Sequence, residues 1–176
     1  LTVEVNGVMY TVGDGITHDV VANTWELEIP GALTNGDFPV VATVTSLVDS
    51  SSVSGGNTLN IDLINPAAPV VDLLPDFTTA TPTITGSATL AAGDVLTVLV
   101  DGVTYRVGDG NLSRDGVANT WSLPIPSGKA LPNGTYPVQA TVNDAAGNNS
   151  SVSEDITVLA FGTAPVAPLV VDQITN

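Results

Sequence analysis

The feature that most constrains the fold is an internal repeat that covers most of the chain. Residues 1–10, LTVEVNGVMY, align with residues 96–105, LTVLVDGVTY. Further pairs of segments match in the same order: Val12–Gly15 with Val107–Gly110, Val21–Trp25 with Val117–Trp121, Leu33–Gly36 with Leu131–Gly134, Pro39–Val44 with Pro137–Val142, and Ala68–Asp72 with Ala167–Asp172. The offset between partners drifts upward through small insertions, as loops of a tandem repeat do.

The repeat divides the chain into units of about 100 residues. We predict a complete copy over residues 66–160, preceded at 1–65 by a partial copy that lacks its N-terminal strands. Residues 161–176 would form a linker and the start of a third copy. The partial copy is not expected to fold well alone. Either residues 166–176 give it a strand, in cis or by exchange with another copy, or the chain is a circularly cut or partly ordered piece.

Short runs of alternating apolar and polar residues, rich in Val, Thr and Ile, predict strands throughout the complete copy. These runs are Val70–Leu74, Thr81–Ala88, Asp94–Val100, Val103–Val107, Thr120–Ile125, Thr135–Asn143 and Ser150–Leu159. Asp101-Gly102, like Asn6-Gly7 in the first copy, is a two-residue hairpin signal. No helical stripe is present, and seven short strands per copy predict an all-β, immunoglobulin-like β-sandwich.

The amino-acid composition excludes several classes of binding partner. The chain carries 18 acidic residues against three basic ones, a net charge of −15. Nucleic acid and anionic membrane surfaces are therefore unsuitable partners, because both require clustered Lys and Arg. No apolar run is long enough for membrane insertion. The chain has no cysteine, which excludes disulfides and thiolate metal sites.

Catalytic signals are absent from the sequence, and we predict that the protein is not an enzyme. His18 is the single histidine, and its counterpart region, residues 111–114, contains none. We expect His18 to be an exposed loop residue. Trp25 and Trp121 recur in the same Ala-Asn-Thr-Trp context. Each is expected in the core of its sandwich, with carbohydrate stacking as the alternative.

Loop aspartates are the main candidates for binding. Val-Gly-Asp-Gly occurs twice and is followed each time by a second aspartate, as in the pairs Asp14 with Asp19 and Asp109 with Asp115. Carboxylate and carbonyl oxygens exposed by flanking glycines suit Ca²⁺. The alternative is that each aspartate only accepts hydrogen bonds from the backbone of its own turn.

A second candidate lies at the junction between copies, in the segment from Asp62 to Asp72. In an immunoglobulin-like sandwich the loop joining the last two strands lies at the end where the first strand begins. In the complete copy that loop contains Asp144 and Asn148. Asp62, Asp144 and Asn148 are therefore expected to converge, and a cation held between them would stiffen the joint.

The order of these motifs resembles the bacterial immunoglobulin-like repeats of giant RTX and biofilm-type surface adhesins. The resemblance is carried by Asn143–Asn148 with its following strand and Ala-Pro linker, by Trp121–Pro126 and by Leu131–Tyr136. It implies a structural extender at the bacterial cell surface that projects adhesive domains from the cell, with neighbouring repeats as its partners. It also implies Ca²⁺ at the linkers, with Asp62, Asp144 and Asn148 as ligands.

This chain departs from the family pattern at two positions, and two other functions stay open. Ser46 stands where the second copy has Asp144, and Leu159 stands where the first linker has Asp62. A module that binds carbohydrate or protein would use the irregular stretch Gly108–Asn119. Alternatively, the repeats would space a secreted catalytic domain that lies elsewhere.

Ca²⁺ binding is testable by thermal unfolding in EDTA and in millimolar Ca²⁺, with Mg²⁺ as the control. A ligand at about 100 times its Kd adds about 2.7 kcal/mol of stability. In a unit of this size the melting temperature should rise by about 10 °C or more. An unchanged melting temperature would contradict calcium sites as stabilising elements.

Overall fold

The computed structural model describes residues 1–72 and 78–159, and apart from one short 3-10 helix their regular secondary structure consists of β-strands. It contains two compact units: Leu1–Ile64 forms the first, and the second begins at Asn65. The end of the predicted strand Val70–Leu74, the predicted third copy and the predicted exchange strand lie outside the described residues. Within the described ranges, no helix is long and apolar enough to cross a bilayer.

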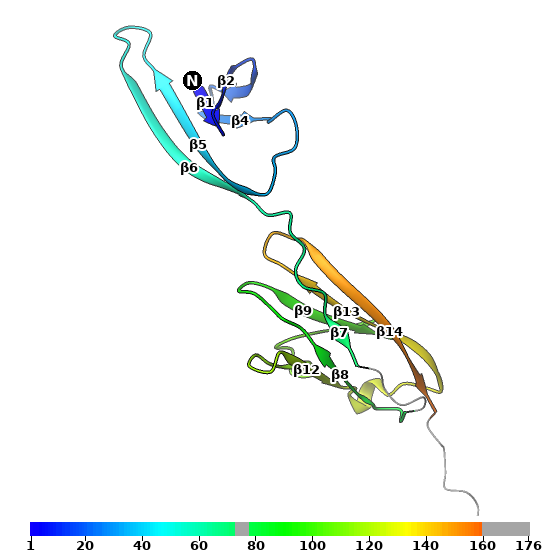
Figure 1. The fold of residues 1–176 in the computed structure, drawn as a ribbon. Helices are drawn as coiled ribbons and strands as arrows, with labels where there is room; N and C mark the ends of the chain where they lie inside the picture. Colours follow the sequence, from blue (N-terminus) through cyan, green and yellow to red (C-terminus); the bar gives the residue numbers. More distant parts are fainter. Residues whose placement is uncertain (73–77, 160–176) are drawn as a thin grey trace, which may run out of the picture. The chain divides into compact units, whose positions relative to one another are not determined.

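The second unit is a sandwich of two four-stranded antiparallel sheets (Figure 1). One sheet has the order β10-β9-β13-β14, and the other has the order β11-β12-β8-β7. The strands are β7 (Val70–Val71), β8 (Thr83–Ser87), β9 (Val95–Val100), β10 (Val103–Arg106), β11 (Ser113–Asp115), β12 (Thr120–Pro124), β13 (Gly134–Asn143) and β14 (Asn149–Val158). A short 3-10 helix, Ser127–Lys129, precedes β13. The predicted immunoglobulin-like β-sandwich is confirmed.

The core of this sandwich follows from the alternation within its strands. In β9, Leu96, Val98 and Val100 are buried, and each lies directly opposite a buried residue of β13. Those partners are Val142, Ala140 and Val138. The facing sheet contributes buried side chains from β8 and β12, including Ile84, Trp121 and Leu123. Successive residues of a strand point to opposite faces, so a period-2 sequence fills one interior layer.

Close packing of β8 on β12 depends on a glycine opposite a tryptophan. Gly86 pairs with Trp121 in the antiparallel register. A Cβ atom at Gly86 would lie 2.6 Å from Cε2 of the indole and would also overlap the carbonyl oxygen of Val70. Only glycine therefore lets β8 lie between β7 and the indole ring.

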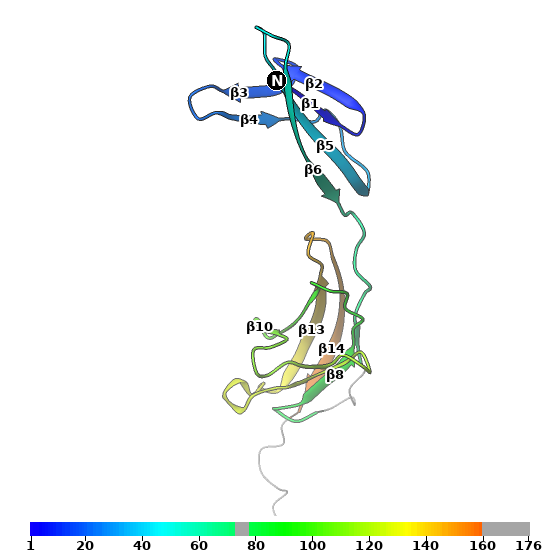
Figure 2. The same ribbon diagram turned by 90° about the vertical axis from the view of Figure 1, so that its left-hand side faces the viewer.

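The first unit repeats six of these eight strands. They are β1 (Thr2–Val5), β2 (Val8–Val12), β3 (Gly15–Asp19), β4 (Thr24–Leu27), β5 (Gly36–Thr45) and β6 (Ser52–Ile61), counterparts of β9 to β14. They form one sheet of order β4-β3-β2-β1-β5-β6, in which β2 and β3 are joined by a short parallel pairing. Figure 2 shows β3 and β4 as a hairpin beside β1 and β2. Within residues 1–64 there is no counterpart of β7 or β8.

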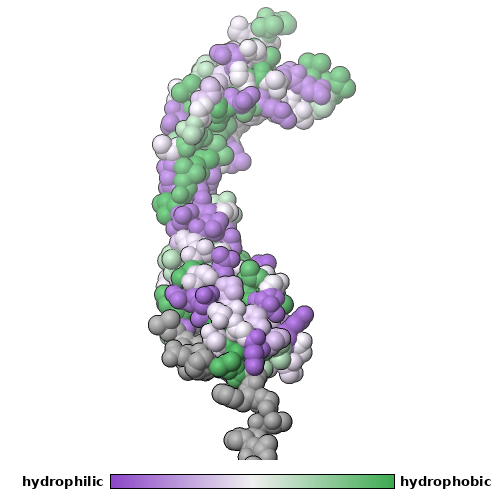
Figure 3. Space-filling model, turned by 90° about the vertical axis from the view of Figure 1, so that its right-hand side faces the viewer, coloured by the Kyte–Doolittle hydropathy of each residue, from purple (hydrophilic) through white to green (hydrophobic). Residues whose placement is uncertain are grey.

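The difference between the units changes the exposure of equivalent residues. Trp121 is 2% exposed, whereas Trp25 is 39% exposed. Val142 is fully buried, whereas its counterpart Val44 is 58% exposed. Thirteen of the sixteen exposed large hydrophobic residues in the described ranges belong to the first unit. Figure 3 shows apolar surface among the polar side chains of this unit. The prediction that Trp25 lies in a core is therefore wrong, because among residues 1–72 and 78–159 no strand covers it.

Two smaller predictions also need correction. The stretch 108–119 was expected to be irregular, but residues 113–115 form β11 against β12. His18 is exposed, as expected, but it lies on β3 and pairs with Trp25 of β4 instead of lying in a loop. Both strands are short and polar, so neither shows the apolar alternation that identifies a strand in sequence.

The glycine requirement predicts that Gly86→Ala destabilises the second unit by at least about 1–3 kcal/mol, because overpacking displaces β8 or the indole. The measurement is urea unfolding followed by Trp121 fluorescence in a Trp25→Phe background. Gly128→Ala is the matched control, because a Cβ at Gly128 meets nothing within 4 Å. Equal stability of the two variants would contradict the packing argument.

Candidate functional site

The second Val-Gly-Asp-Gly motif folds as a turn closed by its own aspartate. Oδ2 of Asp109 accepts a hydrogen bond from the amide of Arg106 at 2.8 Å. Oδ1 accepts from the amides of Asn111 at 2.8 Å and Leu112 at 3.1 Å. These bonds, the one from Arg106 foremost, lower the pKa of Asp109. The carboxylate is therefore ionised at neutral pH, with three backbone donors already directed at it.

The second aspartate of each motif makes the same turn in both units. Oδ1 of Asp115 accepts from the amides of Val117 at 2.8 Å and Ala118 at 3.0 Å. Oδ1 of Asp19 accepts from Val21 and Ala22 at the same distances. Backbone hydrogen bonds are the leading cause of the lowered pKa of both carboxyls. This geometry is the turn-forming alternative that the sequence left open.

The turn between β13 and β14 brings two of the predicted ligands together. Asp144 Oδ1 accepts from the amides of Ala146 and Asn148, both at 2.9 Å. Asp144 Oδ2 accepts from Nδ2 of Asn148, also at 2.9 Å. The Asn148 side chain is the leading cause of the lowered pKa of Asp144. Asp144 and Asn148 therefore form one polar group at this end of the sandwich.

The equivalent turn of the first unit keeps an aspartate although Ser46 replaces Asp144. Ser46 Oγ accepts from the amide of Val48 at 3.2 Å. Asp49 Oδ1 accepts from the amide of Ser51 at 3.1 Å and from its hydroxyl at 2.8 Å. Hydrogen bonds from the Ser46 and Ser51 side chains lower the pKa of Asp49 to about 2. In this turn the carboxylate that accepts the hydrogen bonds comes from Asp49, three residues after the position that aligns with Asp144.

The segment between the units is held at both of its ends. Oδ1 of Asp62, in the first unit, accepts from the amide of Ile64 at 3.0 Å. In the second unit the hydroxyl of Ser150 donates to the carbonyl of Pro66 at 2.7 Å, which fixes the start of that unit against β14. Asp72 Oδ2 accepts from the hydroxyl of Thr85 at 2.7 Å. Asp72 therefore belongs to the β7–β8 pair.

Within the second unit, the structure brings four of the predicted metal ligands together in two pairs. Asp144 contacts Asn148, and Asp72 and Asp115 line one shallow depression of about 330 Å³ on the outer face of the β8–β12 sheet. Among the described residues, no group of three or more His, Asp or Glu side chains is placed to hold a metal ion. The Ca²⁺ ligands, including Asp62 at the junction and Asp109, therefore stay a prediction.

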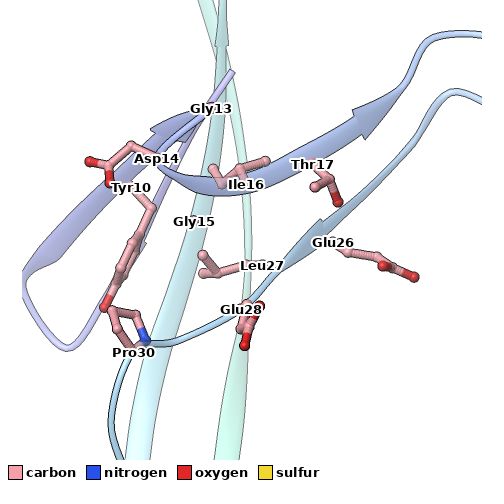
Figure 4. A pocket seen from close by; sticks show the side chains of 10 residues that line it. All are labelled: Tyr10, Gly13, Asp14, Gly15, Ile16, Thr17, Glu26, Leu27, Glu28 and Pro30. Atoms are coloured by element: carbon pink, nitrogen blue, oxygen red, sulfur yellow. The ribbon is translucent and has the colours of Figure 1, made fainter.

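A hollow in the first unit lies on the side that would be interior in a complete sandwich. It measures about 990 Å³ and is lined by residues of β2, β3, β4 and the segments beside them (Figure 4). Three of its apolar residues, Tyr10, Ile16 and Leu27, have counterparts buried in the second unit. These counterparts are Tyr105, Leu112 and Leu123. Asp14, Glu26 and Glu28 make its rim acidic.

This open face was missed by sequence reasoning, although the repeat alignment contains its signal. Trp25 and the hollow are exposed because residues 1–64 have no segment equivalent to Thr83–Ser87. Residues 1–64 contain no run equivalent to the predicted strand Thr81–Ala88. The exposure of Trp25 could have been inferred from that difference.

The lowered pKa of Asp49 predicts a pH dependence for the first unit. A carboxyl with a depressed folded-state pKa stabilises the fold above its unfolded value, about 3.9, and that stabilisation is lost as pH falls toward 2. Asp49→Asn should therefore be less stable than the parent chain at pH 5, with the difference vanishing near pH 2. Urea unfolding followed by circular dichroism measures it. Ser51→Ala removes one hydrogen bond to Asp49 and should narrow the pH range over which its carboxylate stabilises the unit. A stability difference between Asp49→Asn and the parent chain that does not change with pH would contradict this role of Asp49.

Comparison with known proteins concerns mainly the second unit. Residues 77–159 match the family model described as a bacterial Ig-like domain. Comparison with curated proteins gives no match.

Solved structures similar to the chain include two bacterial adhesins. One is a Ca²⁺-stabilised adhesin that helps an Antarctic bacterium bind ice, with 21% identity, a TM-score of 0.46, and 90% of this chain and 40% of that chain covered. Another is a 1.5-MDa bacterial ice-binding adhesin, with 21% identity, a TM-score of 0.41, and 90% and 52% covered. Murine CEACAM1b has 7% identity, a TM-score of 0.47, and 90% and 85% covered. This chain spans less than two thirds of either adhesin chain. Its second unit is an immunoglobulin-like β-sandwich whose sequence is similar to bacterial Ig-like domains.

Proposed function

We propose that the chain is a non-enzymatic spacer segment of a secreted bacterial surface adhesin, in which Ig-like units set the distance between the cell and an adhesive domain. The observation that carries the proposal is that the two units share their scaffold but not their surface chemistry. A repeated spacer needs only the fold to recur, whereas a repeated binding site needs the same functional side chains in each copy.

The shared residues are those that the backbone and the core require. Asn6 and Asp101 open equivalent hairpins at φ of 52° and 48°, and Asn23 and Asn119 have φ of 55° and 56°. Such positive angles favour Asn, Asp and Gly over other residues. The apolar positions facing the interior are kept as well, such as Leu27 with Leu123. Recurrence at these positions preserves a sandwich.

The residues that differ are those that would define a binding surface. Glu26 and Glu28 of the first unit stand where the second has Ser122 and Pro124. His18 stands opposite Arg114 in the alignment, and in the second unit the Arg114 guanidinium donates to the Ala88 carbonyl at 3.2 Å. Neither the acidic rim nor this contact recurs. The comparison therefore favours a scaffold role over a repeated ligand site.

Calcium at the linker is the finer part of the proposal. Its support lies at one end of the second unit, where the carboxylate of Asp144 is kept ionised and its Asn148 partner adds an amide. The bond from Ser150 to Pro66 holds the start of the unit near the same turn. Oxygen-rich, ionised positions of this kind suit Ca²⁺, and a cation there would restrict the linker.

A spacer with a stiff joint should hold its two units at one separation. The chain has no cysteine, so spin labels at Leu47→Cys and Val117→Cys would mark the two units selectively. Both positions are fully exposed. Pulsed electron paramagnetic resonance should give one narrow distance distribution, narrower in Ca²⁺ than in EDTA.

The calcium effect should be lost in Asp144→Asn and kept in Asp155→Asn, which removes the same charge from an exposed strand position. A broad distribution in every buffer would contradict the spacer with a stiff joint. A narrow distribution that is the same in Ca²⁺ and in EDTA would support the spacer function and contradict calcium binding at the linker.

A further inference from the structure

We propose that the joint between the two units is a short hinge, Ile64 and Asn65, bounded by two side-chain clamps, Asn35 in the first unit and Ser150 in the second. Each clamp is a hydrogen bond within its own unit, between a side chain and the backbone of the connecting segment. The inference rests on the proposed spacer function, and it names a source of stiffness for the joint that requires no metal ion.

The first clamp holds the chain beyond the end of the last two strands of the first unit. The pairing of β5 with β6 ends with Gly36 opposite Ile61. Two residues after Ile61, the amide of Leu63 donates to Oδ1 of Asn35 at 2.9 Å. The Asn35 side chain therefore takes the place of a backbone partner, and the chain is still attached to the sheet at Leu63.

A local hydrogen bond restricts the same exit from the first unit. The amide of Ile64 donates to Oδ1 of Asp62 at 3.0 Å. An aspartate that accepts the amide two residues further on closes a turn of its own backbone. Because this turn spans Leu63, whose amide is bound to Asn35, the torsions of Leu63 are restricted. Free rotation of the backbone therefore begins at Ile64.

The second clamp holds the chain where the second unit begins. The hydroxyl of Ser150, in β14, donates to the carbonyl of Pro66 at 2.7 Å, and this hydrogen bond is partly buried. Pro66 is itself half-buried, and Pro69 is buried directly before β7 begins at Val70. The chain is therefore attached to the second unit from Pro66 onward.

Ile64 and Asn65 are the residues between the two clamps, and proline restricts the second of them. A residue that precedes proline is kept extended by its contact with the proline ring, and the ring also fixes φ of Pro66. Residues 62–69 contain no strand or helix. Without the clamps, the seven residues from Asp62 to Ala68 would be free to move. The clamps shorten that free segment to two residues.

The spin-label pair at Leu47→Cys and Val117→Cys tests the clamps in EDTA, where no divalent cation contributes. The parent pair should give a narrow distance distribution. Adding Asn35→Ala together with Ser150→Ala should widen it about twofold, because the spread of a flexible segment grows with the square root of its length. Ser150→Ala should have the larger single effect, because its hydrogen bond is partly buried whereas that of Asn35 is exposed to water.

Matched variants separate the clamps from general effects of substitution. Ser150→Thr keeps the hydroxyl and Asn35→Asp keeps an acceptor oxygen, so both should retain the narrow distribution. Ser153→Ala removes an exposed serine from the same strand and should change nothing. Hydrogen exchange of the Leu63 amide is a second measurement, and it should become faster in Asn35→Ala but not in Ser150→Ala.

The outcomes distinguish the clamped hinge from the spacer function. If the parent pair is narrow in EDTA and the double variant is equally narrow, the hinge is overturned and the spacer function stands. The hinge is overturned in the same way if the parent pair is narrow in Ca²⁺ but broad in EDTA, because the cation then supplies the stiffness. A parent distribution that is broad in every buffer overturns both.

Discussion

The contact between Gly86 and the indole of Trp121 is the constraint on which the closed sandwich depends. It sets how closely β8 approaches β12 and therefore whether the interior is covered. Burying about 200 Å² of indole contributes about 5 kcal/mol. Within the described residues the buried Nε1 of Trp121 has no hydrogen-bond partner, which costs about 1–3 kcal/mol. The apolar term is the larger, so the ring stays inside although one donor is unsatisfied.

The first unit shows what the same sequence elements do without that contact. Its strands pair in the register of their counterparts, and its own interior cluster of Val3, Val5, Tyr10, Ile16 and Phe38 is buried. The side chains next to β4 are left partly in water, because burial there needs a strand along the free edge of β4, as β8 lies along β12 in the second unit. Among the described residues of the first unit no strand lies there, and the face beside β4 is exposed.

Several aspartates in the turns of this protein accept hydrogen bonds from backbone amides. Asp19, Asp109, Asp115 and Asp144 each accept backbone amides of their own turn, which keeps them ionised and fixes the loops between strands. Sequence reasoning found these residues and offered both turn formation and calcium binding. The turn role was predictable because Asx turns are local. Cation binding depends on which carboxylates meet in space, and a sequence gives no distances between separate loops.

The sequence by itself determined the strands of the second unit other than β11, the hairpin turns and the sandwich, because period-2 alternation and residues that tolerate positive φ act over a few neighbours. Only the tertiary structure decided the environment of the tryptophans. Trp25 and Trp121 end the identical segment Val-Ala-Asn-Thr-Trp, yet one is exposed and the other buried. Burial is a property of what packs from elsewhere in the chain, and here that is the strand containing Gly86.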